Sequence, residues 1–271
     1  MSKKLVFFGN QKLATGIYTK PLVMEALAKN NYELAAAITD KIPENLANLG
    51  AEAAVLVAYG HIIPENIITI FPKGIINIHP SLLPIYRGPT PIEQAILNGA
   101  KETGVSLMKL SAKMDAGPIF SQAKINLTGS ETKQELADKL LSLGTELLIK
   151  QLPAILGGSE VSTPQDGSLA TYTNLIKKGD GMVDWSKPAQ QIEREVRAYQ
   201  GWPKTQAKIF GHDVIIMSAR VAGGQNDGDL VMQCQPGWLE IQELKAPSGR
   251  TMSGKDFLHG YTKHRTINNK Q

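Results

Sequence analysis

The chain has 271 residues, which is enough for two domains of ordinary size. Hydrophobic residues make up 42% and charged residues 20%, a composition that excludes an intrinsically disordered chain. No apolar run approaches the ~20 residues that cross a bilayer, so we expect no membrane partner. The single cysteine excludes an intramolecular disulfide, and the N-terminus lacks a signal-peptide core, which together predict a cytoplasmic protein. The net charge of +4 favours a polyanionic partner.

Short apolar runs alternate with helical segments through the first half of the chain. This alternation predicts an α/β fold with a parallel sheet. A capping-box pattern at Thr128–Glu131 begins a long amphipathic helix, which we expect to be part of the core. Its expected buried face carries Leu136, Leu140, Leu143 and Leu147. The expected strands are Leu5–Phe8, Leu34–Ile38, Ala53–Val57, Ile75–Ile78, Val105–Leu110 and Pro118–Ile125, and a helix is expected over Pro21–Lys29.

The second half changes character after a polar, turn-rich stretch. Short β-type runs separated by Gly- and Asn-rich turns dominate it and predict a small OB-like β-barrel. A helix that Ser186 can cap precedes these runs. We therefore expect a Rossmann-like catalytic domain over residues 1–157, a linker over 158–181 and an OB-like domain over 182–271.

The stretch Gly74–Gly88, GIINIHPSLLPIYRG, carries the strongest indication of a site. Asn77 and His79 are two residues apart at the end of a predicted buried strand, so their side chains leave the same face. The prolines and glycine that follow force a defined loop. Open α/β sheets bind ligands at the carboxyl ends of their strands. A hydrogen-bonded pair without catalytic role is the alternative interpretation.

Asp115 lies in a second tight turn, Met114–Pro118, which also follows an apolar run. From a neighbouring loop it could reach His79 and fix its tautomer, which makes Asn77, His79 and Asp115 a candidate catalytic set. Metal catalysis is not expected, because His79 has no second His or Cys at ligand spacing. Ser81 is not in a nucleophile elbow, so nothing predicts a covalent intermediate.

These motifs resemble those of the formyltransferase family, whose members share N-x-H-x-S-L-L-P and a later [LM]-D-[AT]-G. The similarity covers most of the chain, including Tyr86–Leu110. Val183–Pro203 and Leu244–Gly260 resemble the carboxyl-terminal signatures of the members that formylate tRNA.

The resemblance implies transfer of a formyl group from 10-formyltetrahydrofolate, as co-substrate, to the α-amino group of methionyl-initiator tRNA. An oxyanion develops when an amine attacks a formyl carbon, and hydrogen-bond donors must be aimed at it. Asn77 and His79 would supply these donors, and Asp115 would hold His79 and help to move the proton. The loop carried over from the family as part of the folate site is Ser81, Leu82, Leu83 and Pro84.

One departure from the family concerns the segment Asp40–Glu52. The tRNA-formylating members carry a longer, basic loop there, whereas this segment holds one lysine, Lys41. Either tRNA recognition is redistributed to Arg87, Lys177, Lys178 and the basic C-terminus, or the acceptor is an amino-sugar nucleotide or another small amine. A formyl-folate hydrolase and a non-catalytic RNA-binding protein are further alternatives. We expect a monomer.

Overall fold

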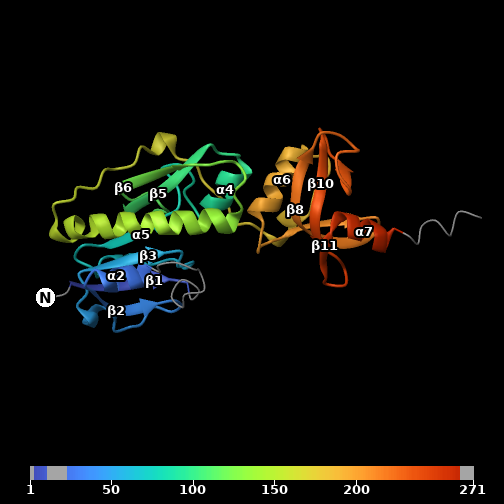
Figure 1. Ribbon diagram of the computed structural model, residues 1–271. Coiled ribbons are helices and arrows are strands. Elements are labelled where there is room, and N and C mark those ends of the chain that lie inside the picture. Colours follow the sequence, from blue (N-terminus) through green and yellow to red (C-terminus); the bar gives the residue numbers. More distant parts are fainter. Residues whose placement is uncertain (1–2, 11–22, 263–271) are drawn as a thin grey trace, which may run out of the picture. The chain divides into compact units, whose positions relative to one another are not determined.

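The computed structural model describes residues 3–10 and 23–262 of the chain (Figure 1). Contacts divide the chain into two compact units. The first unit comprises Met1–Ile92, Lys101–Thr128 and Glu135–Asn174, and the second comprises Glu93–Ala100, Gly129–Gln134 and Leu175–Gln271. Residues 158–174 of the expected linker therefore cluster with the first unit, and residues 175–181 cluster with the second.

The first unit is built on a six-stranded sheet with the order β2-β1-β3-β4-β5-β6. The strands β2, β1, β3 and β4 run parallel, as predicted for a Rossmann-like domain. The strand β5 pairs antiparallel with both β4 and β6, so the sheet is mixed. The loop between β5 and β6 is too short for a parallel crossover, which needs a dozen or more residues. The bounds are β1 Lys3–Gly9, β2 Tyr32–Ile38, β3 Ala53–Val57, β4 Ile75–His79, β5 Glu102–Lys109 and β6 Ile119–Asn126.

Short helices connect these strands. The helix expected over Pro21–Lys29 is observed as α2 (Val23–Lys29), and its first two expected residues lie outside the described ranges. The short segment between β2 and β3 forms one 3-10 turn, η1 (Leu46–Leu49), and Leu46 is buried in the core. The helices α3 (Glu65–Ile68) and α4 (Pro91–Leu97) follow β3 and β4.

The long helix α5 (Lys133–Gly157) lies along the sheet (Figure 1). A Cβ at Gly144 would lie 2.5 Å from the Ile78 side chain and 3.1 Å from that of Val105, so α5 packs closely on β4 and β5. Its length and apolar composition would also suit a membrane span, but core helices of soluble proteins share both properties. Here the apolar face of α5 covers the sheet.

The opposite face of the sheet carries a second layer of apolar contacts. Ile75 belongs to a buried cluster on this face with Val6, Phe8, Tyr59 and Phe71. Because successive side chains in a strand alternate between faces, Asn77 and His79 share the face of Ile75, whereas Ile78 faces α5. The site residues thus point away from α5.

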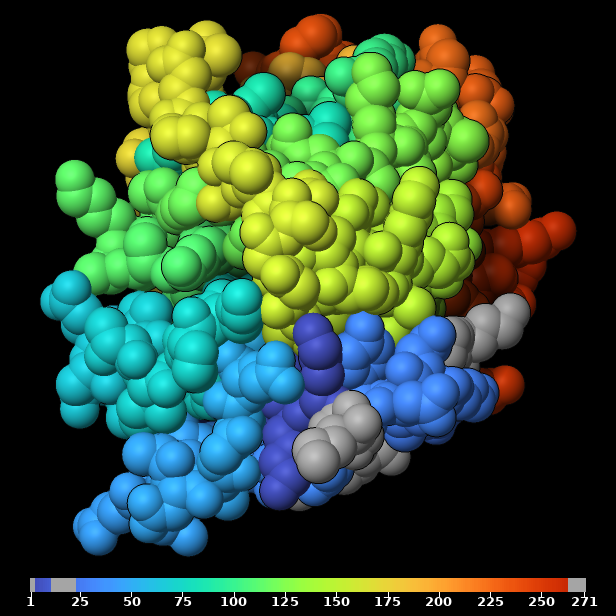
Figure 2. Space-filling model, turned by 90° about the vertical axis from the view of Figure 1, so that its left-hand side faces the viewer, coloured from blue at the N-terminus to red at the C-terminus, as the bar shows by residue number. Residues whose placement is uncertain are grey.

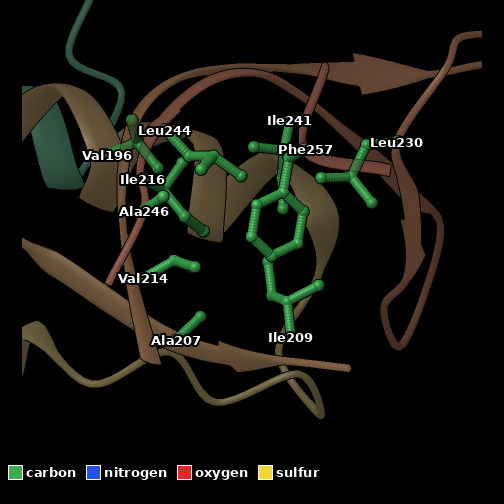
Figure 3. Packing of buried hydrophobic residues seen from close by; sticks show 10 residues of the cluster. All are labelled: Val196, Ala207, Ile209, Val214, Ile216, Leu230, Ile241, Leu244, Ala246 and Phe257. Carbon is green, nitrogen blue, oxygen red and sulfur yellow. The ribbon is translucent and has the colours of Figure 1, made fainter. Parts of the chain in front are cut away.

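The second unit is a curled antiparallel sheet of the small-barrel type, with strand order β11-β10-β8-β7 and β9 paired to β10. Ten buried side chains form its core, and Figure 3 shows them pointing toward one another around Phe257. Phe257 comes from α7 (Gly254–Tyr261), a C-terminal helix that the sequence pattern did not predict. The other elements are η3 Lys178–Gly181, α6 Ala189–Ala198, β7 Thr205–Ile209, β8 His212–Ala222, β9 Val231–Gln233, β10 Trp238–Lys245 and β11 Thr251–Ser253.

Candidate active site

Asn77 and His79 both lie within β4, which continues one residue further than the sequence pattern predicted. Both are buried, at 5% and 4% exposure. In the parallel pairing Asn77 lies opposite Leu56 of β3, and in the antiparallel pairing it lies opposite Met108 of β5. The strand therefore presents an amide and an imidazole side by side near its carboxyl end.

The two ring nitrogens of His79 face different partners. Nε2 lies 3.0 Å from the backbone oxygen of Tyr86. A carbonyl oxygen only accepts, so Nε2 carries the proton and donates it, which leaves the lone pair of the neutral ring on Nδ1. Nδ1 lies 3.7 Å from Oδ1 of Asp115. That separation is an ion-pair distance and exceeds a hydrogen bond. A proton taken up at Nδ1 would therefore face a carboxylate.

Asp115 reaches His79 because the chain folds back after β5. The antiparallel pairing places the end of β5 beside the start of β4, since Lys109 pairs with Ile76. The loop must then return along the sheet, and it does so through a turn in which Asp115 has a φ of 47°. Gly117 is required there, because a Cβ at this residue would lie 1.8 Å from the oxygen of Lys109.

The carboxylate of Asp115 is held on its other side by the loop after β4. Its Oδ2 accepts a hydrogen bond of 2.8 Å from the backbone N–H of Gly88. Gly88 has a φ of 113°, and a Cβ there would lie 2.7 Å from the backbone oxygen of Thr173. The glycine thus permits both the conformation and the close approach. The same loop therefore contacts both residues. Its Tyr86 bonds to His79, and its Gly88 bonds to Asp115.

The loop Ser81–Pro84 lies directly after His79, but its polar groups are bonded within the protein. The Ser81 hydroxyl donates to the oxygen of Ile85 at 2.6 Å. Ser106 of β5 donates to the oxygen of Ser81 and accepts from the N–H of Leu83. Gln122 of β6 donates to the oxygen of Leu83. These internal bonds fix the conformation of the loop. The loop would therefore bind a ligand mainly through the shape of its surface rather than through free hydrogen-bond donors.

Ser106 and Gln122 were missed by the sequence interpretation. Ser106 is fully buried, although it stands among the apolar residues of β5. A lone hydroxyl within an apolar strand is a usable signal, because a buried polar group needs a hydrogen-bond partner. Here that partner is the loop of the site.

Part of the segment expected as a linker is hydrogen-bonded to the loop after β4. Thr171 accepts from the N–H of Arg87 through its backbone oxygen and from the N–H of Tyr86 through its hydroxyl, both at 2.8 Å. Thr173 donates its N–H to the oxygen of Arg87 at 2.7 Å. Figure 2 shows the yellow part of the chain, which contains this segment, packed on green atoms of the same unit. We call residues 159–174 the strap.

Gln165 is the strap residue with the most contacts to the site. Its Nε2 donates to the backbone oxygens of Asp115 and Gly117, at 2.8 and 2.7 Å. Its Oε1 accepts from Nε and Nη2 of Arg87, at 3.0 and 2.7 Å. The polar composition of the strap hid this role, since nothing local distinguishes a bonded glutamine from a solvated one.

The three residues expected to contact tRNA lie in different environments. Arg87 is 5% exposed, and its guanidinium is occupied by Gln165 and by the Tyr172 hydroxyl at 3.2 Å. Lys177 and Lys178 are exposed in the second unit, where Lys178 begins η3. Of the basic C-terminus, Arg250 and Lys255 are exposed, whereas the lysines and arginine beyond residue 262 lie outside the described residues.

Clusters of metal-ligating side chains are a separate feature of the described residues. Across residues 3–10 and 23–262, no three His, Cys, Asp or Glu side chains come together in a way that could hold an ion. The amide of Asn77, the imidazole of His79 and the carboxylate of Asp115 are groups that can donate hydrogen bonds or transfer protons.

Two family matches cover most of the chain. Residues 7–152 match the family described as formyl transferase, and residues 175–262 match its C-terminal domain. The chain belongs to the formyltransferase family. Asn77, His79 and Asp115 all fall within the first matched region.

Individual relatives agree with this family. The chain is 39% identical over 257 residues to a methionyl-tRNA formyltransferase of Chloroflexus aurantiacus, covering 89% of this chain and 83% of the relative. It is 44% identical over 236 residues to a methionyl-tRNA formyltransferase of Roseiflexus castenholzii, covering 83% and 74%. The fold is similar to that of Aquifex aeolicus HypX in complex with tetrahydrofolic acid, with a TM-score of 0.71, 17% identity and coverage of 96% of this chain and 47% of HypX.

Proposed function

We propose that this formyltransferase transfers the formyl group of 10-formyltetrahydrofolate to the α-amino group of methionyl-initiator tRNA in the cytoplasm. The placement of His79 beside Asp115, with Asn77 on the same strand face, is the observation that carries the proposal. The names of the relatives, at 39% and 44% identity over most of the chain, support the acceptor.

The proposed reaction assigns a role to each residue. The amine nitrogen attacks the formyl carbon, and the oxygen of the resulting adduct gains charge. The amide of Asn77 donates a hydrogen bond to that oxygen. His79 accepts the proton lost by the amine at Nδ1, where Asp115 faces it, and delivers it to the folate nitrogen as the carbon–nitrogen bond of the donor breaks. One proton is lost and one is gained, so the enzyme returns to its starting state.

The folate is proposed to lie against the loop Ser81–Pro84. Leu83 is buried, and Leu82 and Pro84 are half-buried, so the loop can offer apolar surface to a flat ring. Its internal bonds to Ser106 and Gln122 hold that surface in place before the ligand arrives. Pre-organisation of this kind lowers the entropy lost on binding.

The second unit is proposed to contact the tRNA through Lys177 and Lys178. Both are exposed, and Lys177 lies three residues after the end of the strap. Phosphate contacts from lysines supply affinity without requiring a long basic loop. We propose that these contacts substitute for the family's loop, since the corresponding segment here is a single turn, η1, anchored by Leu46.

The deciding experiment measures formyl transfer from 10-formyltetrahydrofolate to methionyl-initiator tRNA by the purified protein. Transfer by the wild type that is lost in His79→Ala and retained in His259→Ala, an exposed histidine of α7, is the expected result. Transfer to an amino-sugar nucleotide without transfer to the tRNA would overturn the acceptor. Release of formate without any acceptor would identify a hydrolase instead.

A further inference from the structure

The strap is joined to the catalytic turn and to the loop after β4 through one side chain. Gln165 uses both of its amide N–H bonds on the turn that carries Asp115 and its amide oxygen on Arg87 of the loop. The two segments that contact His79 are therefore linked to each other through a residue from a third segment. We infer that Gln165 is the positioning residue that sets the separation of Asp115 and His79, an inference that rests on the proposed catalytic function.

The position of the turn depends on the hydrogen bonds that hold it, because its backbone conformation is unfavourable. Asp115 adopts a left-handed backbone conformation, which is unfavourable for a residue with a side chain and persists only where surrounding bonds maintain it. Two bonds from Gln165 hold this turn, one at the backbone oxygen of Asp115 itself and one at that of Gly117, two residues later. Without them, both oxygens lose the only side-chain donor that contacts them in the described part of the chain.

The opposite end of Gln165 stabilises the loop. Arg87 is buried, and its guanidinium has Gln165 and Tyr172 as its side-chain hydrogen-bond partners among the described residues. Its backbone is paired with Thr171 and Thr173 of the same strap. The neighbours of Arg87, Tyr86 and Gly88, contact His79 and Asp115 directly. A shift of the strap would thus move both partners of the catalytic pair.

Loss of the Gln165 bonds should lower the turnover number of the enzyme rather than its affinity for the folate. The separation of 3.7 Å between His79 Nδ1 and Asp115 Oδ1 leaves less than an ångström of travel between an ion pair and a hydrogen bond. Misplacement of a catalytic group by about 1 Å lowers rates by about a hundredfold. The hydrogen bonds of Gln165 to the turn and to Arg87 do not involve Ser81, Leu83 or Pro84, so folate binding should be preserved.

Two substitutions distinguish the contribution of the amide N–H groups of Gln165 from that of its amide oxygen. Gln165→Ala removes all its bonds, whereas Gln165→Glu retains an acceptor for Arg87 and loses both donors to the Asp115 turn. We expect both variants to lower kcat by about ten- to a hundredfold with unchanged KM values. Gln165→Ala should also lower the melting temperature, because the buried Arg87 guanidinium loses an acceptor that Gln165→Glu retains. Gln151→Ala is the matched control, because Gln151 of α5 donates to Ser121 in the same unit, away from the catalytic turn.

Several results would overturn the inference. A kcat near that of the wild type in Gln165→Glu would show that only the anchoring of Arg87 matters. An unchanged kcat in Gln165→Ala would remove the role altogether. A parallel loss of melting temperature and folate binding in both variants would show a general structural role.

A second readout does not depend on activity. The ¹⁵N chemical shifts of the His79 ring report which nitrogen is protonated and what it faces. These shifts should differ from the wild-type values in Gln165→Ala and equal them in Gln151→Ala. Unchanged shifts would overturn the inference, and changed shifts in a protein that transfers no formyl group would uphold it while the proposed function fails.

Discussion

The carboxylate of Asp115 accepts the backbone N–H of Gly88 at 2.8 Å, across a separation of 27 residues. Its other oxygen lies 3.7 Å from His79. Asp115 is thus shared between the loop after β4 and the imidazole. Through these two contacts Asp115 connects the loop, the turn and β4. The charge of its carboxylate can be tested separately from its role as a hydrogen-bond acceptor.

Replacing Asp115 by Asn tests that charge. The amide oxygen of asparagine can still accept from Gly88, so the turn should keep its position, but no carboxylate faces His79. We expect kcat for formyl transfer to fall by about a hundredfold or more with little change in KM. Steady-state kinetics with a melting curve on the same sample check this. A kcat within a few-fold of the wild type would show that the charge of Asp115 has no part in the reaction.

Replacing Gly88 by Ala tests the close approach of the loop to the strap. The added Cβ would meet the Thr173 oxygen at 2.7 Å in a conformation with a φ of 113°. We expect a loss of about 1–3 kcal/mol in the free energy of unfolding and a lower kcat, because the N–H that Asp115 accepts is displaced. Denaturant unfolding measures the first quantity. Gly167→Ala is the control, because no other group lies within 4 Å of the added Cβ and the φ of Gly167 is outside the left-handed region.

Replacing Ser106 by Ala tests the internal anchoring of the loop Ser81–Pro84. The substitution leaves the N–H of Leu83 and the oxygen of Ser81 without their bonds to the hydroxyl. We expect a loss of about 1–3 kcal/mol in stability and a raised Kd for the folate. Unfolding curves and a fluorescence binding titration measure the two effects. Ser142→Ala is the control, because the Ser142 hydroxyl donates to the exposed Glu146 of the same helix, and it should change neither quantity.

Replacing both Lys177 and Lys178 by Ala tests the proposed tRNA contact. Each lysine that neutralises a phosphate contributes about one to the slope of log K against log salt concentration. The double variant should therefore bind tRNA more weakly at low salt, with a slope smaller by about two and an unchanged kcat at saturation. Binding isotherms between low and moderate salt provide the measurement. Lys150→Ala, on the exposed part of α5, is the control, and equal slopes in all three proteins would assign the contact elsewhere.

Acid stability of the second unit should depend on Arg220 and Asp227. Hydrogen bonds from Arg220 and from the N–H of Gly223 lower the pKa of Asp227 to about 2. A lowered pKa in the folded state means that the stabilisation is present above the unfolded value of about 4 and is lost as the pH falls through about 2. Arg220→Gln should lower the melting temperature at pH 5 and converge with the wild type near pH 2. Lys208→Gln, which removes a looser surface pair, should show no such convergence.

Much of the fold followed from local patterns. The apolar runs of β1, β3 and β4 predicted a parallel sheet, and the alternation along β4 correctly placed Asn77 and His79 on one face. The expected face of the long helix was only partly right. Leu136 and Leu140 are buried, but the buried face continues through Gly144 and Leu148 rather than through the later leucines, because the sheet approaches at the small glycine.

The parts that could not be predicted depend on distant contacts. Gln165 lies 50 residues from Asp115 and 78 from Arg87, and no periodicity in its polar neighbourhood marks it. Arg87 stands in the sequence as an exposed-type basic residue, yet it is buried because the strap covers it. Burial of a polar side chain is decided by what packs over it, and that is not a property of its own segment.

The sequence by itself predicted the strands of the first sheet, the family and the residue types of the candidate catalytic set. Those depend on residue type and spacing along a few consecutive positions, where strand alternation and turn chemistry act directly. The tertiary structure alone decided that Asp115 faces His79 at ion-pair distance, that Ser106 anchors the loop, and that the strap belongs to the site. These are relations between segments whose separation is set by packing, and hydrogen bonds across such distances exist only once the chain has folded.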